Sequence, residues 1–208
     1  EKLRCIYNHH EQACAIGAES YARIAGKPAL LCVTTGPGGT NALTGVLGAY
    51  LDSIPMLVIS GQVRYDTTAR STGLNIRAMG DQEFDITRAV ASMTKYCELV
   101  TEADKIRFYV KKAFHIATTG RPGPTWLDIP LNIQGAYIDT DGLTDYDESC
   151  EDYIQYEGTL APKVSRELAM EIIDRLKKSE RPVLNVGNGV RIAGAALLRL
   201  PSYLIILS

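Results

Sequence analysis

The sequence lacks the features that mark several large classes of protein. Its 22 Lys and Arg residues nearly balance its 24 Asp and Glu residues, so the net charge is only −2. That charge is not the excess that binds nucleic acid or an anionic membrane surface. No apolar run is long enough to cross a bilayer, and no segment has the pattern of a signal peptide. We therefore expect neither nucleic acid nor a membrane as a partner.

The cysteines give no sign of a disulfide framework or a metal site. There are five, an odd number, and no pair has the spacing of metal ligands. Three of them, Cys5, Cys14 and Cys32, lie in apolar segments. We predict reduced, mostly buried thiols, no metal ligands in this chain, and a cytoplasmic location.

The chain begins at Glu1 without an initiator methionine and enters an apolar run almost at once. This start predicts a piece of a longer protein. With 208 residues, the chain can hold one full domain and part of a second.

Short apolar runs alternate with amphipathic segments along most of the sequence. The runs are rich in Val, Ile, Leu, Cys and Thr, and three are almost continuously apolar, as in parallel strands covered on both faces. Strands that alternate with helices predict right-handed crossovers and an α/β fold with a doubly wound parallel sheet. The predicted strands cover residues 3–7, 29–34, 56–60, 95–99 and 125–129, and the predicted helices cover residues 11–25, 39–51 and 103–118.

This alternation stops in residues 134–162, which are acidic and show no helical or alternating period. We predict a linker there. Beyond it, Ser165 is placed to cap a helix, and a strand at residues 181–186 leads into a glycine-containing turn. The predicted organisation is therefore a first domain at 1–133, a linker at 134–162, and the beginning of a second α/β domain at 163–208.

Glu11 is the first candidate site residue, because it follows the first apolar run and opens a helix. In an open α/β sheet, ligands bind at the carboxyl ends of the strands. An acidic residue in a first helical turn also complements the helix dipole, and that alone can explain it. His9 and His10 beside it are interpreted as polar residues at the edge of the site or as structural residues.

The second candidate is the turn Thr35-Gly36-Pro37-Gly38-Gly39, where glycines let the backbone approach a ligand at a helix N-terminus. It is neither a Walker loop nor a dinucleotide-binding glycine motif. Glycine used only for the geometry of a tight turn is the alternative. From these residues alone, the prediction is a ligand-binding α/β domain.

The ordered set of motifs resembles the acetolactate synthase family and, more broadly, the pyrimidine-binding domain of thiamine-diphosphate-dependent enzymes. The resemblance covers about residues 1–190. It is carried by His10-Glu11-Gln12, residues 18–23, residues 35–41, residues 52–56, Gly61-Gln62-Val63, residues 121–124 and residues 127–130.

The resemblance implies roles for five residues. Glu11 matches the glutamate that hydrogen-bonds a pyrimidine nitrogen and so helps the cofactor deprotonate its own thiazolium C2. Poor solvation of that carboxyl is expected to help it exchange the proton. Pro37, Gly38 and Asn41 match the loop that lies against the pyrimidine. Gln82 matches a glutamine that reaches toward the reacting centre of the neighbouring subunit.

The resemblance also implies partners and a reaction. The expected cofactors are thiamine diphosphate and Mg²⁺, with the metal bound by a diphosphate-binding domain that this chain lacks. We expect a 2-oxo acid as substrate, decarboxylation followed by carboligation, and a homodimer or homotetramer. This chain alone is then expected to be inactive.

One residue departs from the family pattern. Asp81 stands where acetolactate synthases usually have phenylalanine, so the pocket becomes more polar and self-condensation of pyruvate is in question. Two alternatives stay open: a decarboxylase of the oxalyl-CoA or benzoylformate type, and a non-catalytic α/β binding or regulatory module with this fold.

Overall fold

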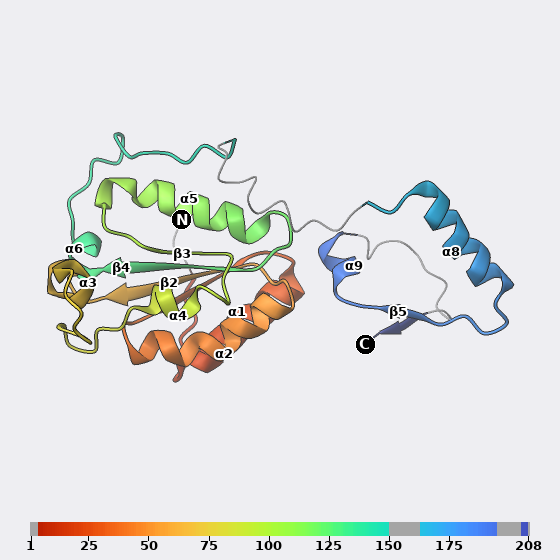
Figure 1. Ribbon diagram of the computed structural model, residues 1–208, viewed down its shortest axis with the longest axis horizontal. Coiled ribbons are helices and arrows are strands. Elements are labelled where there is room, and N and C mark those ends of the chain that lie inside the picture. The colour runs from red at the N-terminus through yellow and green to blue at the C-terminus, as the bar shows by residue number, and fades with distance from the viewer. Residues whose placement is uncertain (1–3, 150–162, 195–204, 208) are drawn as a thin grey trace. The chain divides into compact units, whose positions relative to one another are not determined.

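The computed structural model describes residues 4–149, 163–194 and 205–207. The chain forms two compact units, residues 1–159 and residues 160–208 (Figure 1). Each unit is described by itself below.

The first unit contains a parallel sheet, as predicted, and the sheet has four strands. The strands lie in the order β1-β2-β4-β3. Their bounds are Ala29–Val33 for β1, Met56–Gln62 for β2, Tyr96–Leu99 for β3 and Pro124–Pro130 for β4. All three strand pairs are parallel, and β2 and β4 are the central strands. The carboxyl ends of β1, β2 and β4 therefore meet at one edge of the sheet.

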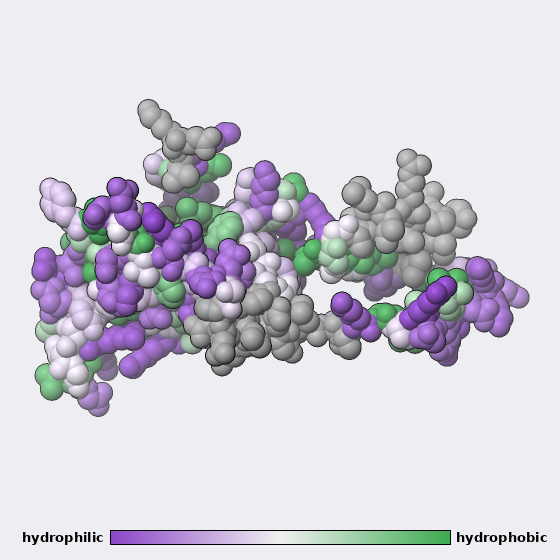
Figure 2. All heavy atoms as spheres, turned by 90° about the horizontal axis from the view of Figure 1, so that it is seen from above, coloured by the Kyte–Doolittle hydropathy of each residue, from purple (hydrophilic) through white to green (hydrophobic). Residues whose placement is uncertain are grey.

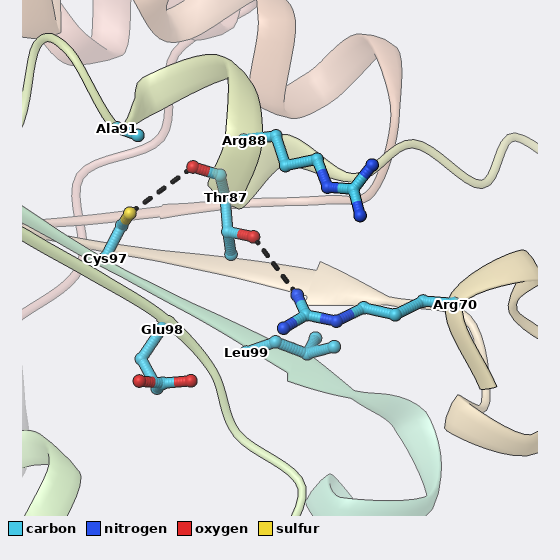
Figure 3. Close-up of a pocket in the computed structure, with 7 residues that line it drawn as sticks. All are labelled: Arg70, Thr87, Arg88, Ala91, Cys97, Glu98 and Leu99. Carbon is cyan, nitrogen blue, oxygen red and sulfur yellow. Dashed lines mark hydrogen bonds between the residues drawn. The ribbon is translucent and has the colours of Figure 1, made fainter. Parts of the chain in front are cut away.

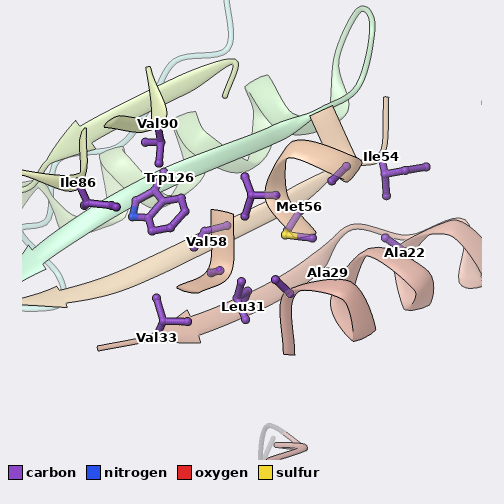
Figure 4. Packing of buried hydrophobic residues seen from close by; sticks show 14 residues of the cluster. Ala22, Ala29, Leu31, Val33, Ile54, Met56, Val58, Ile86, Val90 and Trp126 are labelled. Carbon is purple, nitrogen blue, oxygen red and sulfur yellow. The ribbon is translucent and has the colours of Figure 1, made fainter. Parts of the chain in front are cut away.

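Helices cover both faces of this sheet, so the doubly wound α/β fold is confirmed (Figure 1). Successive residues of β2 point to opposite faces of the sheet: Met56 and Val58 belong to one buried cluster and Leu57 to another. The first cluster packs under α1 (Glu11–Ala25), α2 (Pro37–Leu51) and α4 (Ile86–Val90) and centres on Trp126 (Figure 4). The second packs under α5 (Ile106–Thr118).

Helices α1 and α2 pack unusually closely, and this sets the geometry of the site. A Cβ atom placed on Gly45 would lie 2.6 Å from the Cβ of Ala15 and 2.8 Å from the backbone nitrogen of Ile16. Only a glycine lets the two backbones come so near. The sequence indicated a small-residue helix at 11–25, and Ala15 and Ala22 are its buried positions.

The predicted strand at residues 3–7 is wrong for the residues that the structure describes. Residues 4–8 have no regular secondary structure, with Ile6 73% and Tyr7 90% exposed. Leu3 lies outside the described residues. An apolar run becomes a strand only where a neighbouring strand supplies its hydrogen bonds. Within the described part of the chain, β1 pairs with β2 alone.

The cysteines are less buried than predicted. Cys5 and Cys32 are exposed, and Cys14 and Cys97 are partly buried free thiols. Cys32 lies on β1, where buried and exposed residues alternate, and it points to the exposed side. Cys150 lies outside the described residues.

Residues 135–149, the first part of the predicted linker, pack back onto α5. Tyr146 is buried, and its ring lies edge-on to Phe108 with the centroids 5.4 Å apart. The Lys111 ammonium contacts the Asp145 carboxylate at 2.6 Å, and Arg107 donates to the carbonyl of Thr140 at 2.6 Å. Residues 150–162 lie outside the described residues, so the predicted domain boundaries stay a prediction.

Three short helical segments, η1 (Tyr65–Thr67), α3 (Ala69–Thr72) and α6 (Leu131–Gln134), follow the carboxyl ends of β2 and β4, and η2 (Ala103–Lys105) precedes α5. On the face of the first unit seen in Figure 2, hydrophilic side chains predominate and hydrophobic ones are scattered between them.

The second unit contains the helix and the strand predicted for it. Ser165 caps α8 (Arg166–Lys178) by accepting a hydrogen bond from the backbone of Leu168 at 3.2 Å. Strand β5 (Leu184–Val186) pairs in parallel with β6 (Ile205–Leu207), and α9 (Gly189–Ile192) follows β5. Throughout the described ranges, no helix combines the length and the apolar character needed to cross a membrane.

Candidate functional site

Glu11 is the first residue of α1. The helix is capped by the preceding His10, whose Nδ1 accepts a hydrogen bond from the backbone of Gln12 at 3.1 Å. This cap agrees with the structural interpretation of His10 and fixes where the helix begins. The Glu11 carboxyl group is therefore held at the N-terminus of a helix, partly exposed.

Asn41 reaches Glu11 from the neighbouring helix. Its Nδ2 donates to Oε2 of Glu11 at 3.0 Å. The contact follows from helix packing, because Glu11 and Asn41 each lie four residues, or about one turn, before the close pair Ala15 and Gly45. The same register that packs the two helices thus also aligns the two polar side chains.

The Asn41 amide is the main reason that the pKa of Glu11 is lowered from its ordinary value of 4.5. A backbone N–H of Glu11 itself acts in the same direction. The family resemblance implied a poorly solvated carboxyl in the assembled cofactor site, and that stays a prediction. Glu11 is partly open to water and is stabilised as a carboxylate.

The turn after β1 brings Gly38 against the same carboxyl group. A Cβ on Gly38 would lie 3.7 Å from Oε1 of Glu11 and 2.6 Å from a methyl carbon of Thr34. Pro37, which is exposed, takes the first position of α2, where its fixed φ suits a helix start. Gly38 is buried, and the Thr34 methyl group lies where a side chain on residue 38 would have to go.

Gln82 reaches this turn through its backbone. Gly36 has φ +54, and a Cβ there would lie 2.3 Å from the carbonyl oxygen of Gln82, so only glycine fits. Gln82 itself has φ +56, which is uncommon for a residue with a side chain, and its side chain is exposed.

The carboxylate of Glu83 holds the segment that carries Gln82. It accepts hydrogen bonds from three backbone N–H groups: Ala69 at 2.7 Å, Met79 at 2.7 Å and Gly80 at 3.1 Å. One side chain thereby joins both ends of the long loop after β2. The left-handed backbone of Gln82 is kept in place by these contacts.

The structure thus brings together the residues that the sequence singled out. Glu11, Gly38 and Asn41 are in direct proximity, Pro37 flanks them, and Gln82 packs by its backbone on the adjacent Gly36. Their functional roles stay a prediction.

A buried polar network beneath the site was not predicted. Asp128, which is 1% exposed, accepts from Ser60 at 2.5 Å and from the Gln62 amide at 2.9 Å. Trp126 donates to Ser60 at 2.8 Å, and Thr35 donates to the Gln62 carbonyl oxygen at 2.8 Å. The only sequence feature that could have revealed it is an ionisable residue inside the apolar strand β4.

Two hollows of about 220 Å³ lie elsewhere on this unit, and neither includes Glu11. The first lies beside β3 and α4 and is lined by Arg70, Arg88 and Cys97 among others (Figure 3). Both arginines contact Asp85, at 3.9 Å for Arg70 and 3.2 Å for Arg88. Glu98 also lines the hollow, so two carboxylates offset the two arginines and the hollow offers no strong anion site. No group of three or more metal-ligating side chains occurs among the described residues.

Comparison with known proteins places this geometry in a family. Residues 1–89 match the model described as "Thiamine pyrophosphate enzyme, N-terminal TPP binding domain". The chain is 34% identical over 195 residues to the acetolactate synthase large subunit of Lactococcus lactis, covering 94% of this chain and 31% of that protein. Residues 1–89 are an N-terminal thiamine pyrophosphate binding domain, and most of the chain is similar to acetolactate synthases.

Other relatives agree with this assignment. The chain is 35% identical over 200 residues to a chloroplastic acetolactate synthase of Nicotiana tabacum, covering 95% of this chain and 28% of that protein. It is 36% identical over 186 residues to the acetolactate synthase of Arthrospira platensis, covering 89% of this chain and 30% of that protein. The chain spans about a third of the length of the curated relatives it matches. The matched residues 1–89 contain all five predicted site residues. The comparisons support thiamine diphosphate as the cofactor and do not favour the non-catalytic alternative.

Proposed function

We propose that this chain supplies the pyrimidine-binding half of the thiamine diphosphate site in a 2-oxo acid decarboxylase and carboligase of the acetolactate synthase type. The observation that carries the proposal is the partly exposed carboxylate of Glu11, held by Asn41 at the carboxyl edge of the sheet beside Gly38.

The residues present fit an aminopyrimidine ring. A flat heterocycle with a ring nitrogen needs one carboxyl oxygen as its partner and a wall without a protruding side chain. Asn41 engages Oε2 of Glu11, whereas Oε1 faces the bare Cα of Gly38. Oε1 is the carboxyl oxygen that does not accept the Asn41 hydrogen bond, and it is the partner proposed for the ring nitrogen.

Glu11 acts in this proposal by holding a proton between its carboxyl group and the ring nitrogen. Contact with the heterocycle excludes water from a carboxyl group that is partly exposed in this chain, and desolvation raises a carboxyl pKa. Bound thiamine diphosphate supplies the electron sink that lets a 2-oxo acid lose carbon dioxide. Asn41 orients the carboxyl group by its hydrogen bond to Oε2.

A second protein surface completes the site. Glu11 lies in neither of the two hollows described above and is partly exposed. We propose that the facing surface comes from a second copy of the protein in a homodimer or homotetramer. It would hold the diphosphate and Mg²⁺, since the described residues of this chain contain no cluster that could bind a metal. The free thiols in the described part of the chain suit a reducing, cytoplasm-like compartment.

The substrate end of the site is more polar than in acetolactate synthases, because Asp81 precedes Gln82. Asp81 and Gln82 are both exposed, and the backbone of Gln82 packs on Gly36. We propose a 2-oxo acid as donor. A carboxylate at position 81 disfavours a second anionic oxo acid as acceptor through like-charge repulsion and favours a neutral one.

The test of Glu11 is the exchange of the cofactor C2 proton for deuterium in the holoenzyme that contains this chain. Glu11→Gln should slow exchange by at least about a hundredfold, the lower range for general acid–base catalysis. Glu19→Gln on the same helix is the matched control, because Glu19 pairs with Arg23 away from the site. The expected result is slow exchange in Glu11→Gln alone, with unchanged circular dichroism in both variants. Exchange at the wild-type rate in Glu11→Gln refutes the proposal.

A further inference from the structure

The side chain of Gln62, at the end of β2, lies between the two backbone segments that form the site. Its Oε1 accepts from the hydroxyl of Thr35 at 2.8 Å and from the backbone N–H of Val63 at 2.9 Å. Its Nε2 donates to the carbonyl of Phe84 at 2.9 Å and to Asp128 at 2.9 Å. All four hydrogen bonds of one buried amide are therefore made within the protein.

These partners leave only one orientation for the Gln62 amide. The Val63 N–H can only donate, so it must face the amide oxygen, and the Phe84 carbonyl can only accept, so it must face the amide nitrogen. Thr35 directly precedes Gly36, and Phe84 follows Gln82 by two residues. The amide thus connects the Gly36 turn to the Gln82 segment.

Asp128 holds the side-chain amide of Gln62 by accepting a hydrogen bond from it. The indole of Trp126 can only donate, so the Ser60 hydroxyl accepts from it and directs its own hydrogen to Oδ1 of Asp128. Oδ2 accepts from Gln62. The Ser60 hydroxyl and the Gln62 amide thus both donate to Asp128, one to each of its carboxyl oxygens.

We infer that Gln62 and Asp128 are positioning residues, which together set the spacing between the Gly36 turn and the Gln82 segment on either side of the cofactor site. The inference rests on the proposed function, because only that function makes this place a cofactor site. The hydrogen bonds that support it belong to the structure itself.

The environment of Asp128 makes this arrangement sensitive to acid. Burial raises the pKa of Asp128 to about 6, against the lowering effect of the Ser60 and Gln62 hydrogen bonds. The nearby charges are those of Asp85, which raises this pKa, and Arg70, which lowers it. A proton on Asp128 replaces an accepting lone pair with a donor and so breaks the direction of the hydrogen-bond chain.

The test is an NMR titration of the ¹⁵N-labelled 208-residue chain between pH 7.5 and 5, without cofactor. The side-chain amide of Gln62 and the backbone amides of Gly36 and Gln82 should shift with one shared midpoint near 6. The backbone amide of Gly48, on the same helix as Asn41 but near its far end, should show no such transition.

Variants then assign the transition. Histidine side chains in general also titrate in this range, so Asp128→Asn must abolish the shared transition. Asp85→Asn must keep a shared transition, with its midpoint moved to lower pH because the charge of Asp85 raises the pKa of Asp128. In Gln62→Met, the Asp128 carboxyl must still titrate while the amides of Gly36 and Gln82 no longer follow it. This last variant separates transmission through Gln62 from a direct electric-field effect.

Two results would overturn the inference: titration of Asp128 in the wild-type chain without movement of the Gly36 and Gln82 amides, or survival of their transition in Gln62→Met. Because the titration uses no cofactor, its failure is distinct from failure of the deuterium-exchange test of Glu11. If the hydrogen bonds exist but do not position the site, Asp128 will titrate without movement of the Gly36 and Gln82 amides. If the cofactor assignment is wrong, the NMR titration will still give the expected result.

Discussion

Replacing Gly45 with alanine should both destabilise the first unit and separate Glu11 from Asn41. The new Cβ would lie 2.6 Å from the Cβ of Ala15 and 2.8 Å from backbone atoms of Ala15 and Ile16. Since backbone atoms cannot rotate away, the two helices must move apart. Overpacking of this kind costs about 1–3 kcal/mol, against which alanine gains about 1 kcal/mol in helix propensity.

Gly48→Ala in the same helix is the matched control, because a Cβ there meets nothing within 4 Å. This variant should gain about 0.5–1 kcal/mol of stability. The propensity gain is common to both alanine variants, so they should differ by the overpacking cost of about 1–3 kcal/mol in the free energy of unfolding, measured by urea denaturation followed by circular dichroism. In Gly45→Ala, the pKa of Glu11 should also rise toward 4.5 as the Asn41 amide withdraws. A Gly45→Ala protein as stable as Gly48→Ala would refute this account of the helix packing.

Two further predictions concern the turn and the buried carboxylate. Gly36→Ala should be at least about 2 kcal/mol less stable than Gly73→Ala in urea denaturation, because both have positive φ but only Gly36 faces a backbone oxygen, 2.3 Å from the added Cβ. Equal losses would contradict the close approach to Gln82. Asp128 has a folded-state pKa above its unfolded value, so the folded state binds more protons between about pH 4 and 6, and stability falls as the pH rises through this range. The rise from 3.8 to about 6 corresponds to about 3 kcal/mol. The unfolding free energy of the wild-type protein should therefore differ between pH 4 and pH 7 by a contribution from Asp128, and Asp128→Asn should remove this contribution. The same pH difference in the variant and the wild type would contradict the burial of a charge at Asp128.

Asp128 illustrates a buried hydrogen-bonded group that opposes global stability. In its ionised form the group costs folding free energy, yet only that form accepts the hydrogen bonds from Ser60 and Gln62 together. Buried networks of this kind specify one geometry at the expense of stability.

The three long helices of the first unit and its central strands could be predicted from local patterns, because local residues mark where each begins and ends; the short helices α3, α4 and α6 were not predicted. Helix α1 begins after the His10 cap and ends at Gly26, whose φ of +64 closes it, and the sequence predicted its limits of 11 and 25. Periodic apolar residues and glycine turns are local information. The grouping of Glu11 with the Gly38 turn was predicted from the rule that strand ends meet at one edge, together with the family resemblance.

The parts that could not be predicted depend on contacts between distant residues. Asp128 meets Ser60 and Gln62 across 66–68 positions of sequence, and only the β2–β4 register reveals the pairing. The run at residues 3–7 has the composition of a strand, but composition does not supply a pairing neighbour. Nor does composition say that Glu83 will gather backbone N–H groups from both ends of a loop.

The measurement that tests the central claim most directly is a ¹³C NMR titration of the Glu11 carboxyl carbon in the 208-residue chain and in its Asn41→Ala variant. The account places the Asn41 amide on this carboxylate, so the wild-type pKa should lie below 4.5 and should rise toward 4.5 in the variant. A Glu11 pKa at or above 4.5, or one that does not respond to loss of the Asn41 amide, would contradict the arrangement on which the cofactor site is built.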